Sequence, residues 1–280
     1  MAPLDADWLG ACRRAADGLQ GVLRDHPTSR ERIVETGVIG EGGDHTLVID
    51  QEAEDVVFAQ LQRLHDDGAR FTAVSEERGG VDFGDPDVLV VIDPIDGSLN
   101  AKRGMTHHAL SIAVADGPTM ADVVFGYVFD LGPGEEWRAV RGQGAWLDDV
   151  PIDDPPPERR TADGKLELVA IESADPVWLA RAAEPLCDTV HRVRAMGSIA
   201  ISMCQVAATR VDGMATLWKS RAVDAAAAQL IVRESGGHVS FPGMDEPLAA
   251  PLDLEPHSPV VAARTAQALR ELSALPCSSR

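Results

Sequence analysis

The chain has 280 residues, 45% of them hydrophobic, and a formal net charge of −20 at pH 7. This length is sufficient for one large domain or for two lobes that share a core. The excess of acids argues against nucleic acid or an anionic membrane as a partner, because both are themselves negatively charged.

We expect no segment that would direct the chain out of the cytoplasm. Its apolar runs are far shorter than the ~18–20 residues of a membrane helix, and its first ten residues lack the basic and apolar regions of a signal peptide. Cys12, Cys187, Cys204 and Cys277 have neither zinc-site nor redox spacing, which fits a reducing compartment. We therefore expect a cytoplasmic protein.

The basic residues are almost all arginine, since only Lys102, Lys165 and Lys219 are lysines among the 25 Lys and Arg. An acidic, lysine-poor composition is typical of proteins that stay soluble in concentrated salt, where the Debye length falls to ~3 Å at 1 M. A codon bias in a GC-rich genome produces the same composition without adaptation to salt. We favour the interpretation of a saline cytoplasm.

Hydrophobic periodicity predicts the elements of the first half. Apolar residues at helical spacing from Leu9 to Leu23 predict a first helix, and a second helix should begin at Asp50, whose carboxylate can cap it. The glycine-rich segment 37–44 between them is expected to be a mobile loop. Strands are predicted at 71–75, 88–92, 109–115 and 122–129, followed by a hairpin of 137–140 and 145–147.

Residues 150–165 are rich in proline and charge, which predicts a boundary between two lobes. Beyond it, strands and helices alternate. The expected strands are 166–171, 190–193 and 213–217, and the expected helices are 178–186, 198–209 and one that opens at Asp224. Long strands in the first half and βα alternation in the second predict a mixed, layered α/β (α+β) domain.

The buried strand 88–92 runs directly into the segment DPIDGSLN at positions 93–100. Such a strand delivers Asp93 to its carboxyl end, where open α/β sheets bind ligands. Pro94 restricts φ and Gly97 permits a sharp turn, so that Asp96 can turn back beside Asp93. Two carboxylates this close repel each other unless a cation neutralises them, and Mg²⁺ prefers oxygen ligands. A plain surface turn explains one such aspartate but not both, so we expect a divalent-metal site.

The segment DPIDGSLN resembles the signature of the inositol monophosphatase family, within the lithium-sensitive, Mg²⁺-dependent phosphatases. Further segments resemble family motifs in the expected order: SEE at 75–77, RGQGA at 141–145, MGSIA at 196–200, VD at 223–224 and ESGG at 234–237. The resemblance spans residues 9–262, and its second motif is weaker because Val223 stands where the family has Trp. It implies a layered αβαβα sandwich, a homodimer and inhibition by Li⁺.

The resemblance also implies the metal ligands and the catalytic residues. The implied ligands of two Mg²⁺ ions are Glu76, Asp93, the carbonyl of Ile95, Asp96 and Asp224, with Asp93 shared by both ions. Asp50 and Glu76 would lie near a third ion, which makes two to three Mg²⁺ per subunit, although a helix cap explains Asp50 equally well. Ser98, with Glu76, would orient and deprotonate the attacking water.

Two departures from the family pattern bear on the substrate. The loop before Asp50 lacks the lysine of animal-type members and resembles that of archaeal-type members, which act on both inositol monophosphate and fructose 1,6-bisphosphate. Leu217 stands where animal enzymes have a glutamate that contacts inositol. The expected substrate-binding residues include Gly97 and Ser98, whose backbone N–H groups can hold phosphate oxygens, and also Gly197 and Ser198. Arg194, Lys219 and Arg221 are expected to bind a second phosphate. Ordinary surface ion pairs are the alternative explanation of these three cations.

The expected function is hydrolysis of a small phosphate monoester, either inositol 1-phosphate or fructose 1,6-bisphosphate or both, by water and Mg²⁺. A 3′-phosphoadenosine 5′-phosphate phosphatase and a non-enzymatic phosphate-binding regulatory protein are the alternatives. The complete set of implied ligands disfavours the regulatory protein. We expect a single phosphatase domain, 1–280, with a metal-binding lobe at 1–150 and an αβ lobe at 165–270.

Overall fold

The computed structural model describes residues 5–39 and 45–277. Its elements up to the proline-rich segment are α1 (Trp8–Asp25), α2 (Ser29–Arg32), β1 (Glu35–Ile39), β2 (His45–Leu47), α3 (Val48–Asp66), β3 (Thr72–Ser75), β4 (Gly79–Asp82), β5 (Leu89–Asp96), α4 (Ser98–Arg103), β6 (Ala109–Ala115), the 3₁₀ turn η1 (Met120–Asp122), β7 (Val123–Asp130), β8 (Glu136–Val140), β9 (Gly144–Leu147) and β10 (Val150–Pro151). The elements beyond it are β11 (Leu166–Glu172), α5 (Pro176–Thr189), β12 (Val190–Arg194), α6 (Ile199–Ala207), β13 (Gly213–Thr216), α7 (Ala222–Glu234), β14 (His238–Ser240), β15 (Val261–Ala263) and α8 (Ala266–Ser273).

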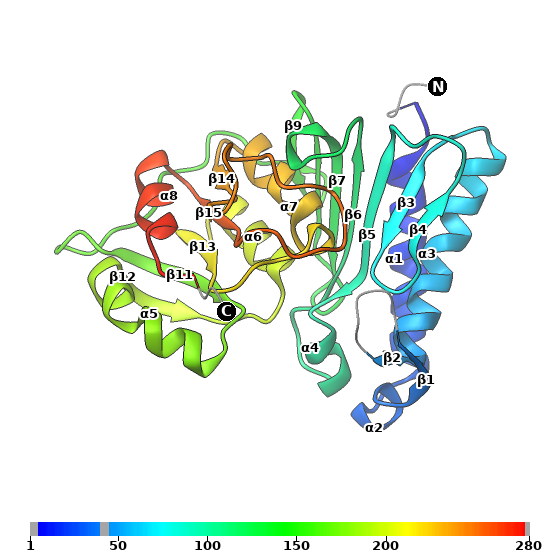
Figure 1. Cartoon of the computed structure of the whole chain (residues 1–280), viewed down its shortest axis with the longest axis horizontal. Coiled ribbons are helices and arrows are strands. Elements are labelled where there is room, and N and C mark those ends of the chain that lie inside the picture. Colours follow the sequence, from blue (N-terminus) through cyan, green and yellow to red (C-terminus); the bar gives the residue numbers. More distant parts are fainter. Residues whose placement is uncertain (1–4, 40–44, 278–280) are drawn as a thin grey trace.

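An eight-stranded sheet forms the first half, in the order β10-β9-β8-β7-β6-β5-β3-β4. Its strands pair antiparallel except for β3 and β5, which are parallel. Helices α1 and α3 cover its outer face (Figure 1), and their apolar sides pack with Phe71, Ile92 and Tyr127 of the sheet region in one buried cluster. The periodic apolar residues that predicted the first helix thus form the side of α1 that faces the sheet.

A five-stranded sheet forms the second half, in the order β12-β11-β13-β15-β14. Helices α6 and α7 lie between the two sheets, and α5 and α8 lie on the outer side of the second sheet (Figure 1). The predicted αβαβα sandwich is therefore confirmed. The two sheets share α7, whose small residues allow close packing: a Cβ on Gly126 of β7 would lie 2.5 Å from the carbonyl oxygen of Ala227.

Two of the family-like segments meet at the edge of this layer. The Glu234 carboxylate, at the end of α7, accepts hydrogen bonds from the backbone N–H groups of Gly142 and Gly144, both at 3.0 Å. The RGQGA hairpin is thus held by the first residue of the ESGG segment. Their joint appearance in the sequence has a structural cause that spacing alone did not reveal.

Three local predictions were wrong, and one of them is the helix expected to open at Asp224, which begins at Ala222. The segment 37–44 was expected to be a loop, but its first residues belong to β1, which pairs antiparallel with β2; residues 40–44 lie outside the described residues. The second helix begins at Val48 and not at Asp50. Asp50 lies in its first turn, where its carboxylate accepts a hydrogen bond from the Leu47 N–H at 3.3 Å, so it still caps the helix from within.

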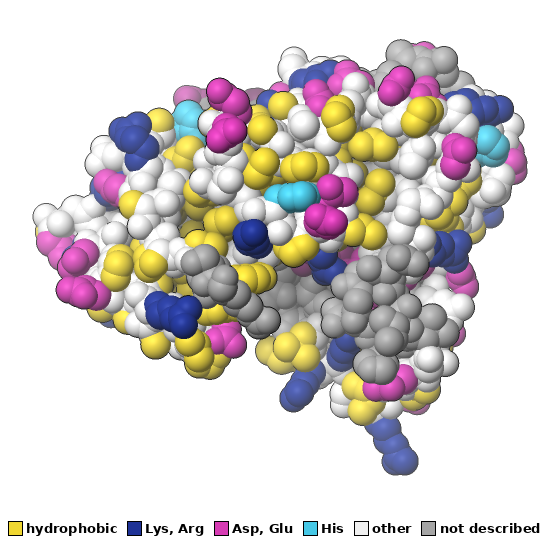
Figure 2. Space-filling view, viewed as in Figure 1, with side chains coloured by type: hydrophobic (Ala, Val, Ile, Leu, Met, Phe, Trp, Pro, Cys, Tyr) yellow, Lys and Arg dark blue, Asp and Glu magenta, His cyan; other side chains and the backbone are white. Residues whose placement is uncertain are grey.

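None of the helices in the described part of the chain combines the length and the apolar character that a bilayer span requires. All four cysteines are free. On the face shown in Figure 2, acidic and basic side chains are interspersed and do not gather into one charged patch.

Candidate active site

A β-bulge in β5 brings Asp93 and Asp96 to the same side of the sheet. Asp93 pairs with Ser111 and Asp96 with Ala109, so three steps along β5 match two steps along β6. In a regular strand, residues three apart point to opposite faces. The extra residue of the bulge shifts the alternation by one, so that Asp93 and Asp96 lie on the same face. The Asp93 carboxylate accepts a hydrogen bond from the Ile95 N–H at 2.9 Å. The two aspartates were expected to meet across a turn after the strand, but they meet within the strand.

Asp224, at the start of α7, completes a group of three carboxylates. Carboxylate oxygens of Asp93, Asp96 and Asp224 lie within 4.8 Å of one another. Asp93 and Asp96 are buried, at 3% and 6% exposed. Burial and the charges of Glu76, Asp96 and Asp224 raise the pKa of Asp93 well above its ordinary value. Three largely buried acids with their oxygens this close together fit a divalent cation, which would neutralise them and take their oxygens as ligands.

Burial and the neighbouring Asp224 also raise the pKa of Asp96, to about 7. Burial raises the pKa of Asp224 to about 6, although Arg221 acts against this increase. The ionised forms of both groups are therefore costly in the protein without a bound cation.

Glu76 follows β3 and is held in place by a buried glutamate from α3. Glu54, 2% exposed, accepts hydrogen bonds from the Ser75 hydroxyl and from the Arg78 N–H, the latter at 3.2 Å, and forms an ion pair with the Arg78 side chain at 3.0 Å. These bonds lie on both sides of Glu76 and fix the turn that carries it. The Glu76 carboxylate in turn accepts a hydrogen bond from Arg221 Nη1 at 2.7 Å, which links it to the Asp224 helix.

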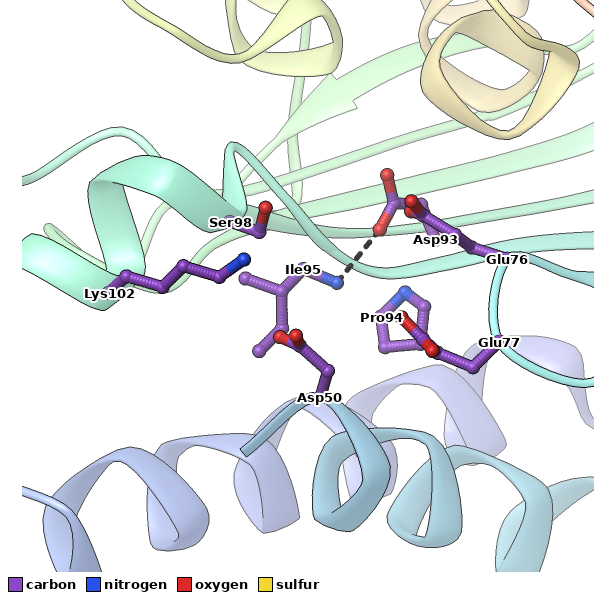
Figure 3. A pocket seen from close by; sticks show the side chains of 8 residues that line it. All are labelled: Asp50, Glu76, Glu77, Asp93, Pro94, Ile95, Ser98 and Lys102. Atoms are coloured by element: carbon purple, nitrogen blue, oxygen red, sulfur yellow. Dashed lines mark hydrogen bonds between the residues drawn. The ribbon is translucent and has the colours of Figure 1, made fainter. Parts of the chain in front are cut away.

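The first cavity at the site brings together residues from four separate segments. It is lined by Asp50, Glu76, Glu77, Asp93, Pro94, Ile95, Ser98 and Lys102. Figure 3 shows the carboxylates of Glu76 and Asp93 close together above Pro94, Asp50 rising from α3, and Lys102 extending from α4. The four predicted residues Asp50, Glu76, Asp93 and Ser98 thus face one space, although 48 sequence positions separate the first from the last.

The hydroxyl of Ser198 supports Asp96. Ser198 Oγ donates to Asp96 Oδ2 at 2.5 Å, and the Ala200 N–H donates to the same oxygen at 2.7 Å. Ser198 also caps α6 by accepting from the Ile201 N–H at 3.1 Å. The side chain is 1% exposed, so the expectation that it contacts substrate is not supported by its position. It holds a carboxylate of the site instead.

The sequence analysis missed Glu172, a buried residue at the end of β11. Its carboxylate accepts hydrogen bonds from the N–H groups of Met196 and Gly197, at 2.8 and 2.9 Å, and from the Ser202 hydroxyl at 2.6 Å. These bonds shape a second cavity, which borders Asp96 and Asp224 and includes Gly197. The signal was present, because Glu172 follows a buried apolar strand just as Asp93 does.

The three cations expected to bind a second phosphate lie in different places. Arg221 is at the carboxylate group. Arg194 is exposed and lines a separate cavity with His107, Asp130 and Glu135. Lys219 is exposed and belongs to neither cavity of the site. The structure therefore does not bring Arg194 and Lys219 together with the carboxylates.

Replacing Ser198 with alanine is expected to lower the free energy of unfolding by about 1–2 kcal/mol, because a helix loses its cap. Thr265→Ala is the matched control, since Thr265 caps α8 by accepting from the Ala268 N–H at 3.2 Å. Urea unfolding should show similar losses for both variants. Catalytic activity at this site should fall only in Ser198→Ala, because only there does Asp96 lose a donor; equal activity in both variants would refute this role of Ser198.

Comparison with known proteins places this arrangement in a family. Residues 7–276 match the model of the inositol monophosphatase family. The chain belongs to this family. The predicted resemblance is thereby confirmed, and the chain is a phosphatase of the phosphoric monoester hydrolase class.

Two relatives and one solved structure illustrate the similarity. A fructose-1,6-bisphosphatase/inositol-1-monophosphatase from Methanothermobacter thermautotrophicus is 29% identical over 244 residues, which are 83% of this chain and 84% of the relative. The Nus factor SuhB of Haemophilus influenzae is 32% identical over 236 residues, 82% of this chain and 84% of the relative. A solved inositol monophosphatase–fructose 1,6-bisphosphatase shares the fold with a TM-score of 0.79 at 23% identity, over 95% of this chain and 98% of that one.

Proposed function

We propose that the protein is a Mg²⁺-dependent phosphatase that releases inorganic phosphate from inositol 1-phosphate, fructose 1,6-bisphosphate or both. The observation that carries the proposal is the meeting of Asp93, Asp96 and Asp224 within 4.8 Å, between two cavities of the same site. The similarity to a relative named for both activities supports the choice of substrates.

The proposed ligands of the metal are Glu76, Asp93, the Ile95 carbonyl, Asp96 and Asp224, with Asp50 near a third position. Divalent ions bound there would stabilise the charge of the phosphoryl group and make water more acidic. Ser98, at the start of α4, positions the attacking water together with Glu76. The backbone N–H groups of Gly97 and Ser98 would donate hydrogen bonds to the phosphate oxygens. Arg221 adds positive charge at the same place.

Phosphate release from a panel of substrates tests this function. The purified chain should hydrolyse inositol 1-phosphate and fructose 1,6-bisphosphate with Mg²⁺, and lose this activity when EDTA removes the metal. Faster hydrolysis of 3′-phosphoadenosine 5′-phosphate would make the nucleotide phosphatase the better description. No hydrolysis of any member of the panel would favour the regulatory alternative, which the similarity to Nus factor SuhB also accommodates.

We further propose that the protein is cytoplasmic, forms a homodimer, and acts as one domain with lobes at 1–150 and 165–270. Inhibition by Li⁺ is expected with these properties. Gel filtration with light scattering measures the oligomeric state, and a Li⁺ titration of the phosphatase reaction measures the inhibition. If phosphatase activity does not change at Li⁺ concentrations of about tens of millimolar, lithium sensitivity is removed from the proposal.

Adaptation to salt predicts that the melting temperature rises as KCl is increased into the molar range. With 45 acids against 25 basic residues, repulsion between acids is the larger electrostatic contribution, and salt screens it. Thermal unfolding in dilute and in molar KCl measures the effect. A melting temperature that does not depend on KCl would leave codon bias as the explanation of the composition.

A further inference from the structure

The guanidinium of Arg221 connects two of the proposed metal ligands. Its Nη1 donates to Glu76 Oε1 at 2.7 Å, and its Nη2 lies 3.6 Å from Asp224 Oδ1. The side chains of Arg221, Glu76 and Asp224 are 23%, 20% and 13% exposed, so water screens these contacts only partly. One cationic side chain thus spans the acids that follow β3 and open α7.

This contact would oppose a divalent cation at Glu76. The guanidinium of Arg221 already occupies one carboxylate oxygen of Glu76, and a divalent cation at Glu76 would bring a second positive charge beside it. The two cations would repel each other strongly, because water screens charges only partly at this position. We propose that Arg221 is the internal counter-ion of the metal site. It neutralises Glu76 and Asp224 in the metal-free protein and leaves Glu76 when a divalent cation binds, which lowers the affinity for the metal.

The local backbone allows the side chain to leave without disturbing the helix. Arg221 is the N-cap residue of α7, and its backbone N–H donates to Asp224 Oδ2 at 3.1 Å. This bond anchors the residue independently of its guanidinium. Once displaced, the guanidinium stays at the rim of the site, where the planar fork of arginine suits the oxygens of a phosphate. The inference rests on the proposed function, because it assigns to Arg221 a role at the same metal site.

Calorimetric titration of Mg²⁺ into the metal-free full chain tests the inference. Arg221→Gln should bind Mg²⁺ about tenfold more tightly than the wild type, because a competing cation is gone. It should also melt at a lower temperature in EDTA, and saturating Mg²⁺ should restore the wild-type melting temperature. Damage to the site would weaken metal binding, so tighter binding separates displacement from a structural defect.

Lys102→Gln is the matched control, since it removes a positive charge from the lining of the cavity that contains Glu76 without touching the Arg221–Glu76 ion pair. It should change the Mg²⁺ affinity by at most about threefold, because Lys102 does not make the direct 2.7 Å contact with Glu76 that Arg221 makes. An equal gain in both variants would show a general field effect and overturn the inference.

Unchanged or weaker Mg²⁺ binding by Arg221→Gln would also overturn it. The proposed function would stand in both cases as long as the wild type binds Mg²⁺. A wild type that binds no Mg²⁺ would instead remove the metal-dependent function, and the role of Arg221 with it.

Discussion

Asp93→Asn is expected to lower kcat/KM for phosphate release by about a thousandfold or more, because the loss of a shared metal ligand removes several kcal/mol of transition-state stabilisation. The fold should remain intact. Asparagine has the same volume, and its carbonyl oxygen can still accept the hydrogen bond from the Ile95 N–H that the structure shows at 2.9 Å. The change therefore removes charge and leaves the bulge of β5 in place.

Asp93→Asn is expected to raise the stability of the metal-free protein. Burial and the charges of Glu76, Asp96 and Asp224 raise the pKa of Asp93 in the folded protein. An acid whose pKa is raised by folding destabilises the folded state once the pH is high enough to ionise it. Asp93→Asn should thus melt at a higher temperature than the wild type in EDTA at pH 8, and this difference should vanish at acidic pH.

Asp245→Asn is the control for the loss of one negative charge at an exposed position. It should retain full activity and wild-type stability in EDTA. Wild-type activity of Asp93→Asn at ordinary Mg²⁺ concentrations would disprove the metal site proposed here.

Gly97→Ala is expected to combine a large loss of stability with a loss of activity of about a hundredfold or more. Gly97 has φ +83°, and a Cβ there would lie 2.8 Å from the His107 carbonyl oxygen and 2.9 Å from that of Gly197. A left-handed conformation costs an L-residue about 1–2 kcal/mol, and the backbone must also shift to relieve the contacts. We expect about 2–4 kcal/mol in the free energy of unfolding. The shift would displace Asp96 and Ser98, the neighbours of Gly97 in the chain.

Gly104→Ala separates the cost of the left-handed backbone conformation from the cost of the close contacts of an added Cβ. Gly104 also has a left-handed φ, +67°, but a Cβ there would meet nothing within 4 Å. It should therefore show only the conformational cost of about 1–2 kcal/mol and keep its activity. Urea unfolding and phosphate release, measured for both variants, check the prediction. Equal losses in the two variants would mean that the close approach of the two carbonyl groups has no importance.

The positions of most elements could be predicted from local pattern, because helix and strand periodicity directly reflect which side of an element is buried. The predicted strand 109–115 coincides with β6, and the helix predicted from Leu9 to Leu23 lies within α1. Several short strands were not predicted, among them β1 and β4. Both consist of glycine or polar residues to a large extent, and only pairing with a neighbouring strand makes them strands.

The acids of the site could also be found in the sequence. Asp93 stands at the end of an apolar strand, and Asp224 stands at the start of a helix of small residues. The relative positions of these acids could not be predicted from the sequence. Whether Asp96 shares a side with Asp93 depends on a bulge in the pairing of β5 with β6, and such a register shift is decided by the partner strand.

Contacts between distant segments were decided by the tertiary structure alone. Arg221 and Glu76 are 145 positions apart and meet because α7 packs between the two sheets. The same packing turns the Ser198 hydroxyl towards Asp96, and the course of the chain after β12 leaves Arg194 at another cavity. A sequence shows which residues carry charge and which sides are apolar, because these are properties of single residues and their spacing. Which charges meet depends on how the layers stack, and that is set by burial over the whole chain.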